Sequence, residues 1–130
     1  MLFRSLSLRL KMIYEGLDRV IGSLKPTEAA FESVFHAENV QSALKLGHAR
    51  GVSMFAAARA NLSVFEYSPL EVKSAVTGYG RAEKSQVQQM VCALLKLGAA
   101  PEHYDASDAL AVAICHVHTH RFRKAVTISL

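Results

Sequence analysis

Two aspartates, Asp105 and Asp108, stand at the head of an otherwise apolar stretch that reads DASDALAVAICHVHTH (105–120). A spacing of three residues in a helix puts both carboxylates on one face, with their Cβ atoms roughly 5–6 Å apart. One interpretation is helix-start chemistry, because aspartate in the first turn caps free N–H groups and meets the positive end of the helix dipole. The other is half of a divalent-metal site, because hard cations take carboxylate oxygens as ligands.

The same stretch continues into the pattern H-x-H-x-H, formed by His116, His118 and His120. His116 and His120 fall on one helical face, but a zinc site needs three or four ligands, and the sequence offers no evident Cys or acidic partner. The alternative is a favourable position for cationic side chains near a helix C-terminus. Cys92 and Cys115 form no C-x-x-C motif, so we interpret them as small buried side chains in a reducing compartment.

The composition is that of one globular domain, which we place at residues 1–130. The chain is 51% hydrophobic and 20% charged, which excludes a disordered protein, and no apolar run approaches the ~20 residues of a membrane span. A net charge of +4 favours a polyanionic partner such as nucleic acid. The basic opening MLFRSLSLRLK suggests a mitochondrial presequence, but it runs directly into a helical pattern, so we favour no targeting segment.

Hydrophobic periodicity predicts helices and strands in alternation. The expected strands cover residues 29–35 and 62–67, and the expected helices cover residues 8–24, 37–60, 82–97 and the stretch from residue 105. Pro26 follows the first of these helices, Asn39 is a local cap of the second, and Gly98 ends the third.

A further short helix is predicted between the second strand and residue 82. Ser68, Pro69 and Glu71 supply an N-cap, a first-turn proline and a capping-box partner. Gly78 and Gly80 then interrupt the helical pattern, either as a simple stop or as a place where the backbone comes close to a ligand.

The number of strands is low for this many apolar helices. Strands that alternate with helices indicate an α/β fold with a parallel pair. A sheet usually needs three or more strands for independent stability, so we expect strands that are missing before residue 8.

Three stretches resemble the RuvC family of bacterial Holliday-junction resolvases in their order and spacing. These are FESVFHAENVQSALKLGHARG (31–51), GYGRAEKSQVQQMV (78–91) and DASDALAVAICH (105–116), supported by IYEGL (13–17) and VFEY (64–67), and together they extend the resemblance over most of residues 8–120. The resemblance implies an RNase H-like α/β fold, here with a reduced sheet of two evident strands flanked by helices. It also implies a homodimeric enzyme that nicks two opposed strands of a four-way DNA junction.

Family members hold two Mg²⁺ ions with four acidic residues. By position, Glu32 resembles the second of these carboxylates, and Asp105 and Asp108 resemble the third and fourth, so the resemblance assigns all three as catalytic and metal-binding residues. Two ions suit the hydrolysis of a phosphodiester, because together they stabilise the attacking and the leaving oxygens.

The resemblance fails at the beginning of the chain. Family members open with a strand that carries an aspartate in a GIDPG-like context, whereas the first acidic residue here is Glu15, inside a predicted helix. Roughly 30 residues of strands and turns are therefore expected to be missing, together with one metal ligand. The sequence leaves open whether the chain is a fragment or a natural truncation. It also leaves open whether the chain is inactive because one metal ligand is absent.

The resemblance also assigns residues to DNA. Phe35 matches a base-stacking phenylalanine, and Lys73, Arg81 and Lys84 match side chains near the scissile phosphate, although Phe is commonly a core residue and Lys and Arg are commonly solvated. Family partners are four-way junction DNA, a second copy of the chain through helix 37–60, and the RuvA–RuvB branch-migration complex in the cytoplasm. The alternatives are a non-catalytic remnant that binds branched DNA and, without any family, a small basic assembly protein.

Overall fold

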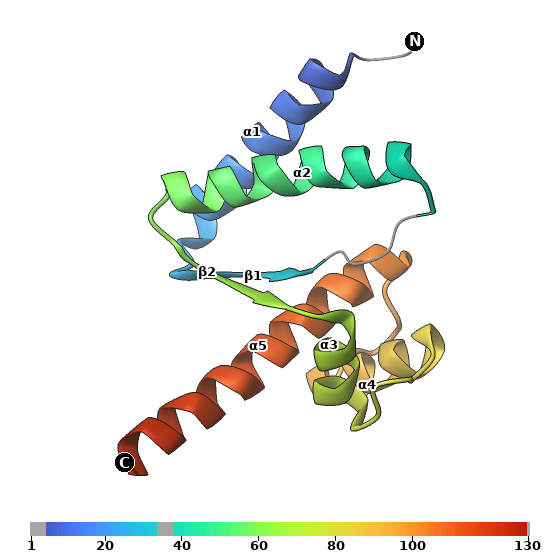
Figure 1. Ribbon diagram of the computed structural model, residues 1–130. Coiled ribbons are helices and arrows are strands. Elements are labelled where there is room, and N and C mark those ends of the chain that lie inside the picture. The colour runs from blue at the N-terminus through green and yellow to red at the C-terminus, as the bar shows by residue number, and fades with distance from the viewer. Residues whose placement is uncertain (1–4, 34–37, 130) are drawn as a thin grey trace. The chain divides into compact units, whose positions relative to one another are not determined.

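The computed structural model describes residues 5–33 and 38–129, with side chains described as far as Arg121 in the last helix. Its elements, labelled in Figure 1, are α1 (Leu6–Leu24), β1 (Glu28–Glu32), α2 (Val40–Arg59), β2 (Ser63–Tyr67), α3 (Pro69–Thr77), α4 (Lys84–Leu95) and α5 (Tyr104–Ser129). Every predicted helix and strand is present in the predicted order, so the alternation expected from the sequence is confirmed.

β1 and β2 form a two-stranded parallel sheet. The N–H of Ser63 donates to the carbonyl of Thr27 at 3.2 Å, and beyond the other end of β1 the N–H of Ser33 donates to the carbonyl of Tyr67 at 2.7 Å. From the first hydrogen bond to the second, the residue number increases in both strands, as it does in a parallel pair. Glu32 is the last residue of β1, so this pairing fixes the backbone that carries the first candidate carboxylate.

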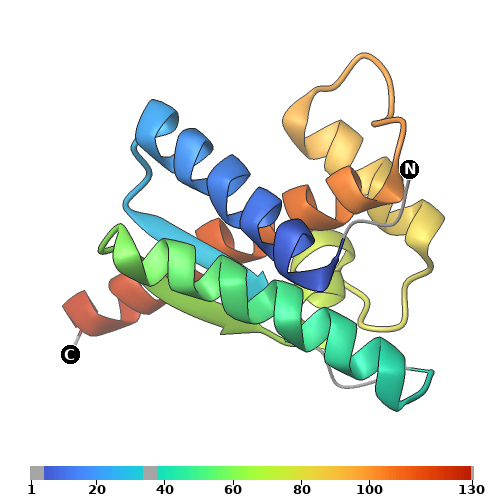
Figure 2. The same ribbon diagram turned by 90° about the horizontal axis from the view of Figure 1, so that it is seen from above.

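The chain divides into two compact units, 1–29 with 34–65 and 30–33 with 66–130, so that each strand begins in the first unit and ends in the second. In the first unit α1 and α2 lie side by side, as Figure 2 shows, with the rings of Tyr14 and Phe55 5.9 Å apart. The Asn39 side chain accepts a hydrogen bond from the N–H of Ser42 at 2.9 Å, which confirms the predicted cap of α2. The assignment of residues 1–130 to one domain stays a prediction.

The second unit contains most of the buried side chains, because α3 and α4 both pack against α5. Val72 and Val76 of α3, Val87 and Val91 of α4, and Ala111, Val112, Ile114 and Cys115 of α5 are buried. Their spacing places them on one face of each helix, whereas Met90, Leu94 and Leu95, which the periodicity of α4 also predicts to be buried, are exposed. This core holds the helices that carry the remaining candidate residues.

Local signals define α3 as the sequence predicted. The Ser68 hydroxyl accepts a hydrogen bond from the N–H of Glu71 at 3.1 Å. Gly78 ends the helix in the left-handed region with a φ of 79°. Gly80 has a packing role, since a Cβ there would lie 2.5 Å from Cδ1 of Leu70. Gly78 is therefore a helix stop and Gly80 permits a close approach to α3.

The predicted boundaries of the helix at 82–97 are wrong by two residues at each end. Glu83 is the N-cap, and it forms a reciprocal capping box with Gln86, whose side chain accepts a hydrogen bond from the N–H of Glu83 at 2.8 Å. At the other end Lys96 takes the left-handed conformation with a φ of 54°, so the helix ends before Gly98. A capping box and a left-handed lysine decide these ends, and neither is visible in the hydrophobic pattern.

Many large apolar side chains remain exposed among the described residues. They include Leu6, Leu8, Met12, Val20 and Leu24 on α1, Val40, Leu44, Leu46 and Phe55 on α2, and Leu94 and Leu95 on α4. The excess of apolar helix surface over sheet surface that the sequence predicted is therefore present. Among the described residues, no helix combines the length and apolar character that crossing a membrane requires.

Candidate metal and nucleic-acid site

One pocket of the second unit is lined by two acidic and two basic side chains. Glu32 comes from the end of β1, Lys73 from α3, Lys84 from the first position of α4, and Asp108 from the second turn of α5. Pro69, Val72, Val87 and Ala111 complete the lining, and the cavity measures about 220 Å³. Four elements far apart in sequence thus bring two predicted metal ligands and two predicted DNA contacts to one place.

Lys84 links α4 to the acidic turn of α5. Its ammonium donates to Oδ2 of Asp108 at 3.2 Å, across 24 residues of sequence. The same ammonium lies 5.2 Å from the centre of the Tyr104 ring, within the range of a cation–π contact. Both partners of the ion pair are largely exposed, with 63% and 41% of their side chains accessible, so the pair adds little to stability.

The pKa of Glu32 is raised above its usual value of 4.5, first because partial burial removes water from the carboxylate and second because Asp108 carries a like charge. Lys73 and Lys84 act in the opposite direction and lower the pKa. The side chain as a whole is exposed, so the shift reflects the acidic neighbour and a partly dehydrated carboxylate. The two carboxylates and two ammonium groups of the lining balance in formal charge, so the raised pKa of Glu32 reports partial dehydration first and the charge of Asp108 second.

A buried polar contact holds α5 against α4 beside this charge cluster. The side-chain amide of Gln88 donates to the hydroxyl of Ser107 at 3.2 Å and to the carbonyl of Pro101 at 3.5 Å. Ser107 is only 1% exposed and immediately precedes Asp108. Because Gln88 lies one turn after Lys84 on α4, the contact fixes the register in which Lys84 meets Asp108.

Two other predicted site residues, Asp105 and Arg81, do not line this pocket. Asp105 is exposed in the first turn of α5, one turn before Asp108, and does not line the cavity. Arg81 is exposed in the turn between α3 and α4. Phe35 and its neighbour His36 lie outside the described residues. The structure thus brings together Glu32, Asp108, Lys73 and Lys84, and it leaves Asp105 on the adjacent turn.

The donor set of the pocket suits a hard divalent cation. Glu32 and Asp108 offer carboxylate oxygens, and Asp105 stands one turn away on the same helix. Mg²⁺ is commonly held by one or two carboxylates and keeps several waters, for which the cavity has room. The two carboxylates also repel each other, which a bound cation would relieve.

Sequence reasoning missed Tyr104 and the Gln88–Ser107 contact. Tyr104 precedes Asp108 by four residues and therefore lies on the same helix face, so its position could have been found from periodicity. The Gln88–Ser107 contact and the Lys84–Asp108 pair depend on how α4 packs on α5, and no local signal in the sequence predicts them.

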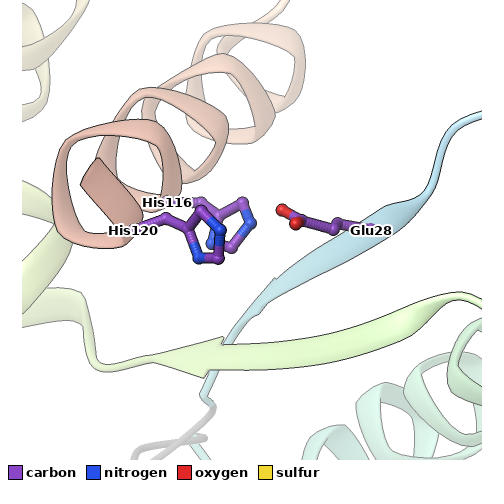
Figure 3. Close-up of side chains that lie close together, drawn as sticks. All are labelled: Glu28, His116 and His120. Atoms are coloured by element: carbon purple, nitrogen blue, oxygen red, sulfur yellow. The ribbon is translucent and has the colours of Figure 1, made fainter. Parts of the chain in front are cut away.

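The histidines of α5 form a separate cluster. The hydroxyl of Tyr67 and Nδ1 of His116 share a hydrogen bond of 2.6 Å, and the rings of His116 and His120 lie 5.4 Å apart (Figure 3). Among the described residues of the second unit, no third metal-ligating side chain joins these two imidazoles; Glu28, which Figure 3 also labels, belongs to the first unit.

The proposed position of these histidines at a helix C-terminus is wrong. α5 continues to Ser129, more than two turns beyond His120. His116 is instead a core side chain that is 8% exposed and has a hydrogen-bonding partner.

A family model described as crossover junction endodeoxyribonuclease RuvC matches residues 3–116. The chain belongs to the RuvC family. Crossover junction endodeoxyribonuclease RuvC of Alkaliphilus oremlandii is 53% identical over 120 residues, which make up 92% of this chain and 73% of that protein. RuvC of Syntrophotalea carbinolica is 58% identical over 119 residues, with the same two coverages of 92% and 73%. The resemblance inferred from the three sequence stretches is confirmed.

Solved RuvC structures share the fold. Thermus thermophilus RuvC matches with a TM-score of 0.84 at 33% identity, over 92% of this chain and 72% of that one. The same protein in complex with a Holliday junction substrate matches with a TM-score of 0.88, with the same identity and coverages of 33%, 92% and 72%. The predicted RNase H-like α/β fold is therefore confirmed.

Replacing Glu32 with Gln should stabilise the metal-free protein at neutral pH. A carboxyl group whose pKa is higher in the folded than in the unfolded state opposes folding once both states are ionised, and this cost disappears as the pH falls through the folded pKa toward the unfolded value. In EDTA at pH 8, we expect Glu32→Gln to raise the melting temperature by on the order of 1–2 °C, discounted for exposure, and by less at pH 5.

The matched control is Glu102→Gln, which removes an exposed carboxylate from the loop before α5. It should leave the melting temperature unchanged at both pH values. A lower melting temperature for Glu32→Gln at pH 8 would mean that the carboxylate stabilises the pocket, contrary to this account.

Proposed function

We propose that this chain is a Holliday-junction endonuclease, which nicks opposed strands of four-way DNA junctions by Mg²⁺-dependent phosphodiester hydrolysis in DNA recombination and repair. The observation that carries the proposal is the pocket in which Glu32 and Asp108 meet Lys73 and Lys84. Membership of the RuvC family supports the reaction. The similarity to a RuvC structure that contains a Holliday junction substrate supports the choice of DNA.

The acidic residues of the pocket would bind cations, and its basic residues would bind DNA phosphates. Two Mg²⁺ ions, once bound, would activate a water and stabilise the leaving oxygen. Glu32 and Asp108 would hold the cations from the pocket, and Asp105 would do so from the preceding turn of α5. Lys73 and Lys84 would neutralise the phosphate that enters between the carboxylates, and Arg81 would contact a neighbouring phosphate, since backbone phosphates dominate DNA affinity.

Two further assignments rest on the family resemblance. Phe35 follows the strand that carries Glu32 and would stack on a base at the open centre of the junction, as aromatic side chains do on unpaired bases. The RuvA–RuvB branch-migration complex would be the protein partner in the cytoplasm.

Cutting two opposed strands requires two active sites, and a homodimer through α2 would provide them. Val40, Leu44, Gly47, Gly51 and Phe55 recur at intervals of three and four residues, and all five are exposed. Side chains built at Gly47 and Gly51 would meet nothing within 4 Å. A second α2 can therefore come close to this stripe of small and apolar residues. Ala43, another small residue of the predicted interface, is exposed, whereas Ala49 is partly buried.

A second candidate function is a non-catalytic module that binds branched DNA. It would need only the basic side chains and no cation on Glu32, Asp105 or Asp108. The basic side chains at the pocket would serve both functions. Cleavage rather than binding therefore distinguishes the two.

Junction cleavage by the 130-residue chain should be weak, because three carboxylates can hold one cation but hold a second cation poorly. We expect little product from an end-labelled four-way junction in Mg²⁺. Fusion of a strand that carries the family's aspartate should restore symmetric cleavage. In that restored protein Asp105→Asn or Asp108→Asn should reduce the rate by about 100-fold or more, the upper end of the loss for groups that only support metal ligands.

Asp18→Asn on α1 is the matched control, since it removes an exposed aspartate that is not part of the pocket lining and should cut normally. Efficient symmetric cleavage by the 130-residue chain would show that three carboxylates suffice. Tight junction binding without cleavage in the restored protein would favour the non-catalytic module.

Self-association should depend on α2. Gly47→Arg places a long cation on the exposed stripe and should convert a dimer into a monomer at tens of micromolar, as measured by light scattering. Gly22→Arg, at an equally open helical glycine of α1, should leave the mass unchanged. Equal masses for wild type and Gly47→Arg would exclude this face as the dimer interface.

A further inference from the structure

Lys84 occupies an unusual place for an exposed lysine. Its ammonium is positioned by the carboxylate of Asp108 at 3.2 Å and by the ring of Tyr104 at 5.2 Å. An exposed lysine gains little from one partner, because ordering its long side chain costs entropy. Two partners on α5, with α4 held in register by Gln88 and Ser107, keep this cation in the lining of the pocket beside Asp108.

The Lys84 ammonium and a divalent cation would use the same oxygen atoms. Asp108 is the carboxylate that Lys84 contacts, and it is also the pocket residue that supplies cation ligands from α5. A cation on Asp108 would meet the Lys84 charge within a few ångströms, and like charges at that distance repel even in water. This repulsion disfavours a state in which both remain in close contact with Oδ2.

We propose that Lys84 is an internal counter-ion that competes with the divalent cation for Asp108, so that cation binding releases its ammonium to the DNA phosphate. This inference rests on the proposed metal site and deepens it, because it makes one residue act on the metal and on the DNA in turn. In the metal-free protein the lysine lowers the repulsion between Asp108 and Glu32. Once the cation takes over that task, the ammonium is free to contact the substrate.

The proposal has a consequence opposite to that expected for a lysine that only binds DNA. Removing its charge should weaken junction binding and cleavage, yet it should strengthen cation binding in the absence of DNA. Thermodynamic linkage adds that a phosphate which draws Lys84 away from Asp108 must tighten the cation site. Lys73 lines the same pocket, but no ion pair between it and Asp108 is found among the described residues, so the competition is assigned to Lys84.

The test is a titration with Mn²⁺ in the absence of DNA, followed by the loss of the free-ion signal in electron paramagnetic resonance. Lys84→Met removes the charge and keeps an unbranched side chain, and it should tighten Mn²⁺ binding by roughly three- to tenfold at low salt. Lys84→Arg keeps the charge and should bind Mn²⁺ as the wild type does. Lys11→Met on α1 changes the net charge equally at a residue that is not part of the pocket lining, and it should also behave as the wild type.

A double-mutant cycle identifies Asp108 as the contested group. In an Asp108→Asn background, Lys84→Met should gain much less affinity than it gains with Asp108 present. Unchanged or weaker Mn²⁺ binding by Lys84→Met would overturn the inference, and so would a full gain that persists in Asp108→Asn. If the wild type binds Mn²⁺ and Lys84→Met does not change the affinity, the inference about Lys84 is overturned and the proposed metal site is not. Absence of Asp108-dependent binding in every variant overturns the proposed metal site as well.

Discussion

The packing of α3 and α4 on α5, which brings Asp108 into one pocket with Glu32, is the constraint on which the candidate site depends. Glu32 comes from the end of β1 and Asp108 from α5, with α2, β2, α3 and α4 between them in the chain, and the charge of Asp108 contributes to the raised pKa of Glu32 after partial burial. Lys73 and Lys84 lower that pKa, and the packing of α4 on α5 brings Lys84 to Asp108. Two carboxylates in one pocket offer the oxygen ligands that hard divalent cations take, and this property links the fold to metal-dependent chemistry.

Most of the fold could be predicted from the sequence because its signals are local. Ser68 with Glu71 marks the start of α3, Gly78 marks its end, and Asn39 caps α2, as predicted. The ends of α4 could not be predicted in this way, because Lys96 adopts a left-handed conformation that non-glycine residues seldom take. The role of His116 was missed for a related reason, since its partner Tyr67 lies 49 residues away in the chain.

The candidate site was predictable as a set of residues but not as an arrangement. Spacing placed Asp105 and Asp108 on one helix, and the family resemblance added Glu32, Lys73 and Lys84. Only the tertiary packing shows that Lys84 contacts Asp108 and Tyr104, and that Asp105 stays outside the pocket. The spacing of charged residues along a chain does not say which charges will meet. The assignments of Phe35 and Arg81 to DNA stay predictions.

The most direct test of the account is a crystal structure of the chain soaked with Mn²⁺, with anomalous scattering used to locate the ion. The account predicts a peak at the carboxylates of Glu32 and Asp108, with the Lys84 ammonium displaced from its present 3.2 Å contact with Asp108. A fully occupied Mn²⁺ site elsewhere, with the Lys84–Asp108 pair intact and no peak in this pocket, would contradict it.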